Sequence, residues 1–354
     1  EAAFKVVVPA AKSGIFASLV LGVGRALGET MAVVMVAGNA PTYPNGLFNS
    51  FRVMTANIVM EMGYAGELQE GALIATGVVL LIFILIVNMI FNTISNKSVK
   101  KIVSVTSRRG SRKRMPLFGG VKEKIGAFLY TIKIASVGKW AAIVSGVLSG
   151  IALILIMGFV FVNGLPELIT NPHLIFGKYE FGSENITILP SIVATLMAVV
   201  LSLVIAVPIG IMTAVFLNEY TKKNNIFVRV IRTAIDILSG VPSIVYGLFG
   251  MITFVKVFGG SSSIIAGSLT VSIMLLPTIV RSTEESLKAV EDSLREGSFA
   301  LGAGKLRTIF KIVLPASLAG IISAVILSMG RVVSESAPFL YTMGSVISAV
   351  PHGY

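Results

Sequence analysis

The sequence contains no cysteine among its 354 residues and only two histidines, His173 and His352. The lack of cysteine excludes disulfides and thiolate metal sites, and two histidines in loop-like segments leave little material for another metal site. Charged residues are also scarce, at 13% of the chain, whereas 55% of the residues are hydrophobic. A soluble domain needs more charge to cover its surface, so the composition predicts a membrane protein.

Long apolar runs recur along the chain, and each is close to the ~20 residues that a helix needs to cross the hydrocarbon core. They predict an all-α fold, a polytopic transmembrane helical bundle with about seven spans. The first run is too long for a cleavable signal peptide and is followed by further spans. Since the sequence does not begin with Met, we expect a fragment of a longer protein. The predicted spans are residues 14–38, 71–94, 141–163, 189–217, 232–258, 264–280 and 316–343.

The net charge of +12 comes from lysines and arginines that gather in some of the loops between these spans. Residues 97–140, 218–231 and 281–315 are rich in them, whereas residues 39–70 and 164–188 hold one each. Basic loops remain on the cytoplasmic side of a membrane. We therefore expect a multi-pass protein of the plasma (inner) membrane with a cytoplasmic N-terminus. The lipid bilayer, and no nucleic acid, is the partner that this charge pattern predicts.

The most basic segment, residues 97–140, is predicted to be a cytoplasmic linker held near the anionic headgroups. It divides the chain into residues 1–96, with two spans, and residues 141–354, with five.

Two segments of the chain are similar at an offset of 306 residues. FKVVVPA at residues 4–10 pairs with FKIVLPA at residues 310–316, and GRALGET at residues 24–30 pairs with GRVVSES at residues 330–336. Apolar helices resemble one another by chance, but Pro, Gly, Arg and Glu at a shared spacing are not expected by chance. The repeat predicts two related transport units in one chain.

Charged residues lie inside two predicted spans, Arg25 with Glu29 in the first and Arg331 with Glu335 in the last. A spacing of four residues puts each pair on one helical face, where the charges partly neutralise one another. Ionisable groups within the membrane usually face a polar pathway, although an ion pair that only locks helices together would show the same spacing. Arginine matches the geometry of an oxyanion such as phosphate, and the glutamate keeps the empty site near neutral, so that the anion is released again.

Two further features of the spans can each be interpreted in two ways. Arg281 ends the predicted span 264–280 and is either a third cation of the pathway or an ordinary anchor at the cytoplasmic surface. The span 232–258 is interrupted at residues that suit either a packing kink or a gating element, Gly240, Pro242 and Gly247.

Residues 284–315 alternate polar and apolar positions at helical spacing, with Gly302 and Gly304 interrupting the run. This pattern predicts short amphipathic helices at the cytoplasmic surface. Residues 302–305 resemble the end of a phosphate-binding loop, but Leu306 stands where such loops need Ser or Thr. The chain is therefore not predicted to be an enzyme, and any ATPase must be another chain.

The same segment fits a spacing pattern of Glu, two small residues, three arbitrary residues, Gly, nine arbitrary residues, Ile, any residue, Leu and Pro. The residues that fill it are Glu296, Gly302, Ile312, Leu314 and Pro315. In this respect the chain resembles the permeases of bacterial type I ABC importers. The resemblance implies that this loop couples the permease to an ATP-binding-cassette ATPase dimer, which binds the ATP, and that the permease holds no cofactor or metal.

Further segments resemble the permeases of the high-affinity phosphate importer, namely RALGET at residues 25–30, GVPSIVYG at residues 240–247 and LLPTIVRSTEE at residues 275–285. Residues 1 to about 100 resemble the end of its C-type permease, and residues from about 140 resemble an A-type permease without its last span. The resemblance implies an external phosphate-binding protein as partner, together with another permease subunit or the missing parts of this one. It also implies translocation roles for Arg25, Glu29, Arg281, Arg331 and Glu335. Ser334 and Ser336 depart from the usual Gly and Thr around that glutamate.

Two other functions fit the sequence. One is the same transport system for another oxyanion, such as sulfate or molybdate, or for a polar solute. The other is a membrane scaffold that reports phosphate status, for which Glu296 would be dispensable.

Overall fold

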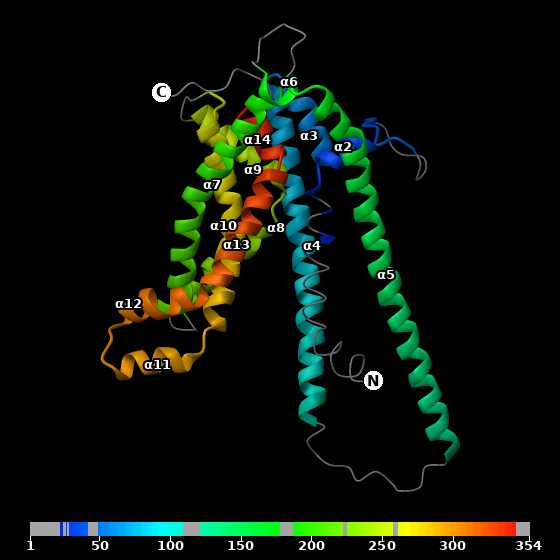
Figure 1. Cartoon of the computed structure of the whole chain (residues 1–354), viewed down its shortest axis with the longest axis vertical. Coiled ribbons are helices and arrows are strands. Elements are labelled where there is room, and N and C mark those ends of the chain that lie inside the picture. The colour runs from blue at the N-terminus through cyan, green and yellow to red at the C-terminus, as the bar shows by residue number, and fades with distance from the viewer. Residues whose placement is uncertain are drawn as a thin grey trace. The chain divides into compact units, whose positions relative to one another are not determined.

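A computed structural model of the chain describes residues 22–23, 26, 28–41, 49–108, 121–177, 187–221, 225–257 and 261–344 (Figure 1). The chain divides into two compact units. Unit one comprises Glu1–Val20 and Met89–Leu189, and unit two comprises Leu21–Asn88 and Pro190–Tyr354. Every regular element in the described ranges is a helix, apart from an isolated bridge between Gly38 and Phe51. The predicted all-α fold is confirmed.

Unit one contains the second part of α4 (Glu67–Arg108), the long helix α5 (Val121–Thr170) and the short α6 (His173–Phe176). Both long helices continue into the segment predicted to be a linker, of which residues 109–120 lie outside the described ranges. The apolar part of α5, Ala142–Thr170, has no buried residue in its most apolar window. This helix therefore exposes its apolar surface on all sides, as a helix surrounded by lipid does.

Within the described ranges, unit two contains the first part of α4 and the remaining helices, including three π-helical turns labelled η. These are α2 (Met31–Val36), α3 (Met54–Met62), α7 (Leu189–Val215), η2 (Phe216–Tyr220), α8 (Ile226–Gly240), α9 (Ser243–Gly250), η3 (Met251–Val257), α10 (Ile264–Ala289), α11 (Asp292–Ala300), α12 (Lys305–Thr308), η4 (Ile309–Val313), α13 (Leu314–Ser334) and α14 (Ala337–Thr342).

Five helices of the described part are long and apolar enough to cross a membrane, or six if α8 and the α9–η3 helix count as one broken span. The five are Leu68–Val87, Ala142–Thr170, Leu189–Tyr220, Ile264–Ala289 and Lys305–Ser334. The predicted first span, residues 14–38, is described only in part, because residues 14–21, 24, 25 and 27 lie outside the described ranges, and its described part is non-helical at Glu29 and Thr30. The other six predicted spans each correspond to one of these segments. Span 232–258 is broken near Pro242, one of the residues at which the sequence indicated an interruption, whereas span 316–343 was wrongly predicted to be continuous.

The predicted span 232–258 is two helices, Ile226–Gly240 and Ser243–Val257, whose axes differ by 103°. The break falls at Pro242, which has no N–H to donate and disfavours helical backbone at the residue before it. Val241 accordingly has extended backbone, with ψ of 131°. The bend turns a single apolar run into an elbow within unit two.

The predicted span 316–343 is also interrupted, because α13 ends at Ser334 and α14 starts at Ala337. Pro338 explains the interruption, since in a continuous helix its ring would clash with the carbonyl of Ser334. Arg331 and Glu335 therefore lie at the end of α13, with Glu335 in extended backbone, and not in the middle of a helix as predicted. The predicted position of Arg281 at the end of its helix is also wrong, because α10 continues beyond it to Ala289.

The internal repeat is confirmed in the local structure of its described residues. At the offset of 306 residues, Glu29 corresponds to Glu335, and both stand in a non-helical break before a short helix. Those helices, Met31–Val36 and Ala337–Thr342, coincide residue for residue at the same offset. Gly38 and Gly344 follow them with φ of 78° and 84°, a left-handed conformation that glycine adopts without steric cost.

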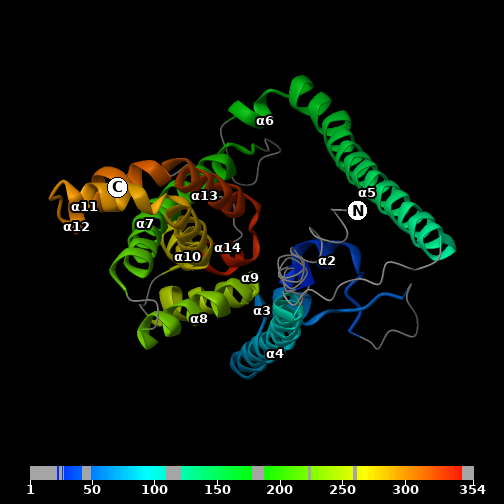
Figure 2. The same ribbon diagram turned by 90° about the horizontal axis from the view of Figure 1, so that it is seen from below.

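Helix α10 is the centre of unit two, since 61% of its most apolar window is buried, against 22% for α7 and 28% for α13. Helix α13 lies alongside α10 in both views of the chain (Figures 1 and 2), and α8 also packs against α10. Small residues let α7 approach closely: the Ser202 hydroxyl donates to the Ser268 carbonyl at 3.3 Å, and the Ser272 hydroxyl donates to the Ser202 carbonyl at 3.1 Å. The central position of α10 gives its polar residues contact with several helices at once.

Candidate functional site

Arg331 lies at the end of α13 with its guanidinium between two partners. Its Nε stands 3.6 Å from the Glu335 carboxylate, and its Nη1 donates to the Thr278 hydroxyl of α10 at 3.0 Å. The side chains of Arg331 and Glu335 are 33% and 21% exposed. The guanidinium is therefore oriented by two neighbours and still accessible to a solute.

Arg281 follows Thr278 by one helical turn on α10, so Arg281 and Arg331 lie against the same stretch of that helix. Its guanidinium forms an ion pair with Asp236 of α8. The two side chains are 38% and 60% exposed, so water reaches the pair. An anion that entered here would compete with Asp236 for Arg281.

The first copy of the repeat reaches the same elbow. A Cβ on Gly28 would lie 3.2 Å from the Pro242 side chain, so the backbone before Glu29 packs directly on the break between α8 and α9. Glu29 is exposed, and Arg25 lies outside the described residues. The structure thus places one half of the first predicted pair beside the elbow.

The second copy packs on the other predicted break residue. A Cβ on Gly247 would lie 3.0 Å from the Ala337 carbonyl oxygen and 3.1 Å from the Pro338 Cα. Gly240, the third break residue, ends α8 and is partly exposed. The first copy therefore contacts the elbow itself at Pro242, and the second copy contacts α9 at Gly247, within the helix that follows the elbow.

A second group of charges lies further along α10 towards Ala289. The Glu284 carboxylate, 10% exposed, is 2.6 Å from Arg232 of α8 and 2.7 Å from Lys288. This carboxylate pairs with two cations at the end of α10, where the transmembrane bundle meets the segment predicted to couple to an ATPase.

That segment folds as a hairpin of α11 and α12, which confirms the predicted short helices. Gly302 turns the chain between them with φ of 79°, a left-handed conformation that favours glycine. The hydroxyls of Ser298 and Thr308 lie 2.8 Å apart and join the two helices. We call residues 292–308 the hairpin.

The pattern residues of this segment divide into two groups. Glu296 and Gly302 are exposed on the hairpin. Ile312 lies in η4, and Leu314 and Pro315 open α13, which continues from η4 with helical backbone. Exposed apolar side chains surround the first group, namely Leu294, Phe299, Leu301 and Leu306.

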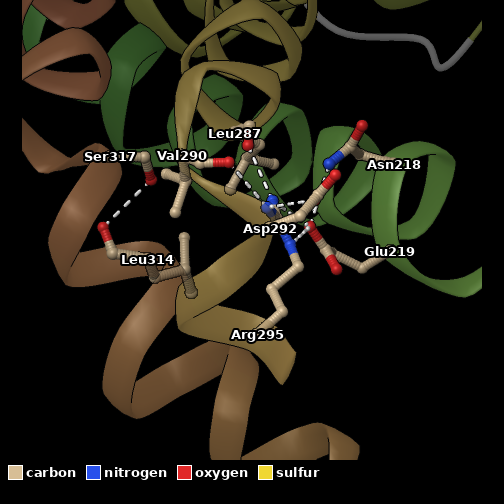
Figure 3. Close-up of polar contacts among 8 residues, drawn as sticks. All are labelled: Asn218, Glu219, Leu287, Val290, Asp292, Arg295, Leu314 and Ser317. Carbon is tan, nitrogen blue, oxygen red and sulfur yellow. Dashed lines mark hydrogen bonds and ion pairs between the residues drawn. The ribbon is translucent and has the colours of Figure 1, made fainter. Parts of the chain in front are cut away.

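Arg295 joins the hairpin to the helices above it (Figure 3). Its Nη2 donates to Glu219 Oε1 of η2 at 2.9 Å and to the Leu287 carbonyl of α10 at 2.8 Å. Its Nη1 donates to the Val290 carbonyl at 2.7 Å and to Asp292 Oδ1 at 3.0 Å. Arg295 and Glu219 are 14% and 10% exposed, which makes this a largely buried ion pair.

The sequence interpretation missed these partners. The sequence analysis assigned no functional role to Asp236, Thr278, Glu284, Glu219 or Arg295. Arg232 and Asp236 stood within a predicted span and carried the same signal as Arg331, a charge inside an apolar run. Glu219 and Arg295 are separated by 76 residues, so no local pattern relates them. Within the described ranges, no group of three or more His, Asp or Glu side chains is placed to hold a metal ion.

Comparison with known proteins identifies the family. Residues 206–351 match the family described as "Binding-protein-dependent transport system inner membrane component". The probable ABC transporter permease protein YqgI of Bacillus subtilis is 32% identical over 207 residues, which cover 58% of this chain and 68% of that protein. The chain belongs to the ABC transporter permeases. The matched region holds α8 to α14, and so contains Arg281, Arg331 and the hairpin of the permease.

Other relatives of the permease carry phosphate transport in their names. A "Phosphate transport system permease protein PstA homolog" of Mycoplasma pneumoniae is 30% identical over 394 residues, 96% of this chain and 58% of the relative. The "Phosphate transport system permease protein PstA" of Mycobacterium leprae is 46% identical over 150 residues, 42% of this chain and 49% of the relative. The permease chain therefore spans about half the length of these curated relatives.

Proposed function

We propose that this permease forms the translocation path of an ATP-driven phosphate importer. In this proposal an external binding protein delivers phosphate, and a separate ATPase dimer supplies the energy. The observation that carries the proposal is the Arg331 guanidinium, held by Glu335 and Thr278 at a helix break and one third exposed, in a chain similar to PstA permeases. A fork of N–H donors that stays charged at every physiological pH suits a phosphate oxyanion.

The neighbouring carboxylates explain how such a site releases its anion. Each arginine already has a tethered carboxylate, Glu335 on Arg331 and Asp236 on Arg281. Phosphate has to displace a carboxylate to bind, and the carboxylate returns when phosphate leaves. Binding is thereby kept weak enough for conduction, which requires that the anion leave as readily as it enters.

We assign the conformational change that exposes the path to either side to the helix breaks. The elbow at Pro242 packs on Gly28 of the first copy, and Gly247 packs on α14 of the second. A shift of the elbow would therefore move the neighbouring backbone of both copies, and with it Glu29 and Glu335. This supports alternating exposure of one path shared by the two copies.

The hairpin is the surface that we assign to the ATPase. It presents Glu296 and Gly302 among exposed apolar side chains, which suits docking into a cleft of a partner. In this proposal the hairpin and the N-terminal end of the chain lie on the cytoplasmic side. Another permease subunit, or further parts of this one, would complete the path.

Phosphate uptake by the full-length permease, assembled with its ATPase and binding protein, tests the proposal. Replacing Arg331 with Gln should lower uptake at least about tenfold, because Gln loses the charge that pairs with the anion. Arg229→Gln on α8 is the matched control, since Arg229 is exposed and is not one of the two residues that hold Arg331, namely Glu335 and Thr278. It should transport normally.

The amounts of assembled complex must be equal for the three proteins, as measured by co-purification of the ATPase. Normal phosphate uptake by Arg331→Gln would refute the role of this arginine. If the wild-type complex takes up sulfate or molybdate and leaves phosphate outside, the phosphate assignment is wrong.

A further inference from the structure

We propose that Arg295 is a positioning residue that clamps the hairpin to η2 and α10, so that movement of the hairpin is transmitted to α7 and α10 together. The inference depends on the proposed function, because it assigns the step by which ATPase docking would reach the translocation path. It concerns an arginine and a partner, Glu219, that lie outside the spacing pattern of the coupling segment.

The junction between α10 and the hairpin needs such a clamp. Helix α10 ends at Ala289 and α11 begins at Asp292, with only Val290 and Glu291 between them. Both have extended backbone, with ψ of 128° and 133°. Two extended residues form a joint about which a nine-residue helix would turn freely unless side chains fixed it.

Arg295 fixes that joint by spanning it. From the second turn of α11 its guanidinium reaches back to the carbonyls of Leu287 and Val290, at 2.8 and 2.7 Å. Leu287 lies in the last turn of α10 and Val290 directly follows the helix, where carbonyl groups lack helical partners and a cation is favoured. The same guanidinium reaches sideways to Glu219, which is further held by Asn218 Nδ2 at 2.9 Å. One side chain thus ties three elements together (Figure 3).

A second contact joins the other arm of the hairpin to the same place. Lys305 of α12 lies with its Nζ 5.0 Å from the centre of the Tyr220 ring, directly after Glu219 in η2. The Ser298 and Thr308 hydroxyls hold the two arms to each other. The hairpin therefore contacts the end of α7 through both arms, and η2 is a π-helical turn of the kind often found at functional sites.

The two carboxylates on Arg295 provide an internal control. Glu219 is 10% exposed and comes from another helix, whereas Asp292 is 88% exposed and lies three residues away on the same helix. An exposed pair within one helix contributes little, but a largely buried pair between elements holds them in one arrangement. Glu219→Gln should therefore matter and Asp292→Asn should not.

The first test measures phosphate imported per ATP hydrolysed in proteoliposomes that contain the full-length permease, its ATPase and its binding protein. Arg295→Gln and Glu219→Gln should each lower this ratio by roughly five- to tenfold, the lower range of measured couplings between sites. ATP hydrolysis should continue, because the docking surface around Glu296 is intact. Asp292→Asn should keep the wild-type ratio. A loss of folding would lower both activities in parallel, whereas loss of the clamp lowers only the ratio.

The second test does not depend on the solute. The 354 residues hold no cysteine, so spin labels at Leu301→Cys and Phe216→Cys, which are 91% and 41% exposed in the wild type, report the distance between hairpin and η2. The distance distribution should be narrow in the labelled parent and in Asp292→Asn, and clearly broader after Glu219→Gln. An unchanged distribution and an unchanged coupling ratio in Glu219→Gln would overturn the inference.

The proposed function and the clamp fail in different ways. If the parent protein imports no phosphate, the proposed function fails, and the label distances still decide whether the clamp exists. If the parent imports phosphate and Glu219→Gln imports as much per ATP, the clamp fails and the importer stands.

Discussion

Replacement of Glu284 tests whether the end of α10 is assembled as the structure shows. Glu284 and Glu285 are neighbours in the sequence, but Glu284 is buried and Glu285 is exposed. Glu284 pairs with Arg232 at 2.6 Å and with Lys288 at 2.7 Å. Glu284→Gln would remove the charge that both cations face, whereas Glu285→Gln would remove a charge of the same kind from a solvated position.

The size of the effect follows from the exposure of the three side chains. Removing one partner of a fully buried ion pair costs about 3–5 kcal/mol, and an exposed pair contributes about 0–1 kcal/mol. Here the carboxylate is 10% exposed, but Arg232 and Lys288 are 40% and 54% exposed and regain water when it is lost. We therefore expect Glu284→Gln to lower the free energy of unfolding by about 2 kcal/mol, between the two limits.

The assay is thermal unfolding of the purified full-length permease in detergent. A loss of about 2 kcal/mol corresponds to a fall of roughly 4–8 °C in the unfolding temperature for a domain of this size. Glu285→Gln should shift it by less than about 2 °C, since exposed substitutions usually change stability by less than ~0.5 kcal/mol. Equal shifts for the two variants, or a larger one for Glu285→Gln, would refute the burial of Glu284 and its pairing with α8.

Two further predictions concern the breaks. Thr278→Val removes the hydroxyl that accepts from Arg331 at 3.0 Å, so it should raise the KM for phosphate uptake by roughly threefold or more, while Thr278→Ser should not; equal values would contradict the contact. Gly247→Ala would place a Cβ 3.0–3.1 Å from α14 at Ala337, Pro338 and Tyr341. It should cost about 1–3 kcal/mol in thermal unfolding, whereas Gly297→Ala, with open space around it, should not destabilise the protein.

The sequence by itself determined the features that depend on local composition. Apolar runs long enough to span a bilayer cannot remain in water, so the predicted spans reappear as helices such as α7 and α10. The shared Pro, Gly, Arg and Glu at an offset of 306 residues predicted equivalent local structure, and α2 and α14 coincide at that offset. The amphipathic period, interrupted at Gly302 and Gly304, likewise predicted short helices, which are α11 and α12.

Some errors were also local and could have been avoided. Pro338 carries the signal for a helix end as Pro242 does, but its apolar surroundings favoured a continuous span over residues 316–343. Hydropathy measures only how readily a segment enters lipid, and it is insensitive to whether the backbone within that segment can keep its hydrogen bonds.

Only the tertiary structure decided which charges meet. Arg281 pairs with Asp236, Arg331 bonds to Thr278, and Arg295 bonds to Glu219, across 45, 53 and 76 residues of sequence. Each partnership depends on the angle at which α8, α10, α13 and the hairpin pack, and that angle is set by side-chain volumes along the whole interface. A charge in an apolar run indicates that a partner is needed, but the identity of the partner is a property of the packed helices.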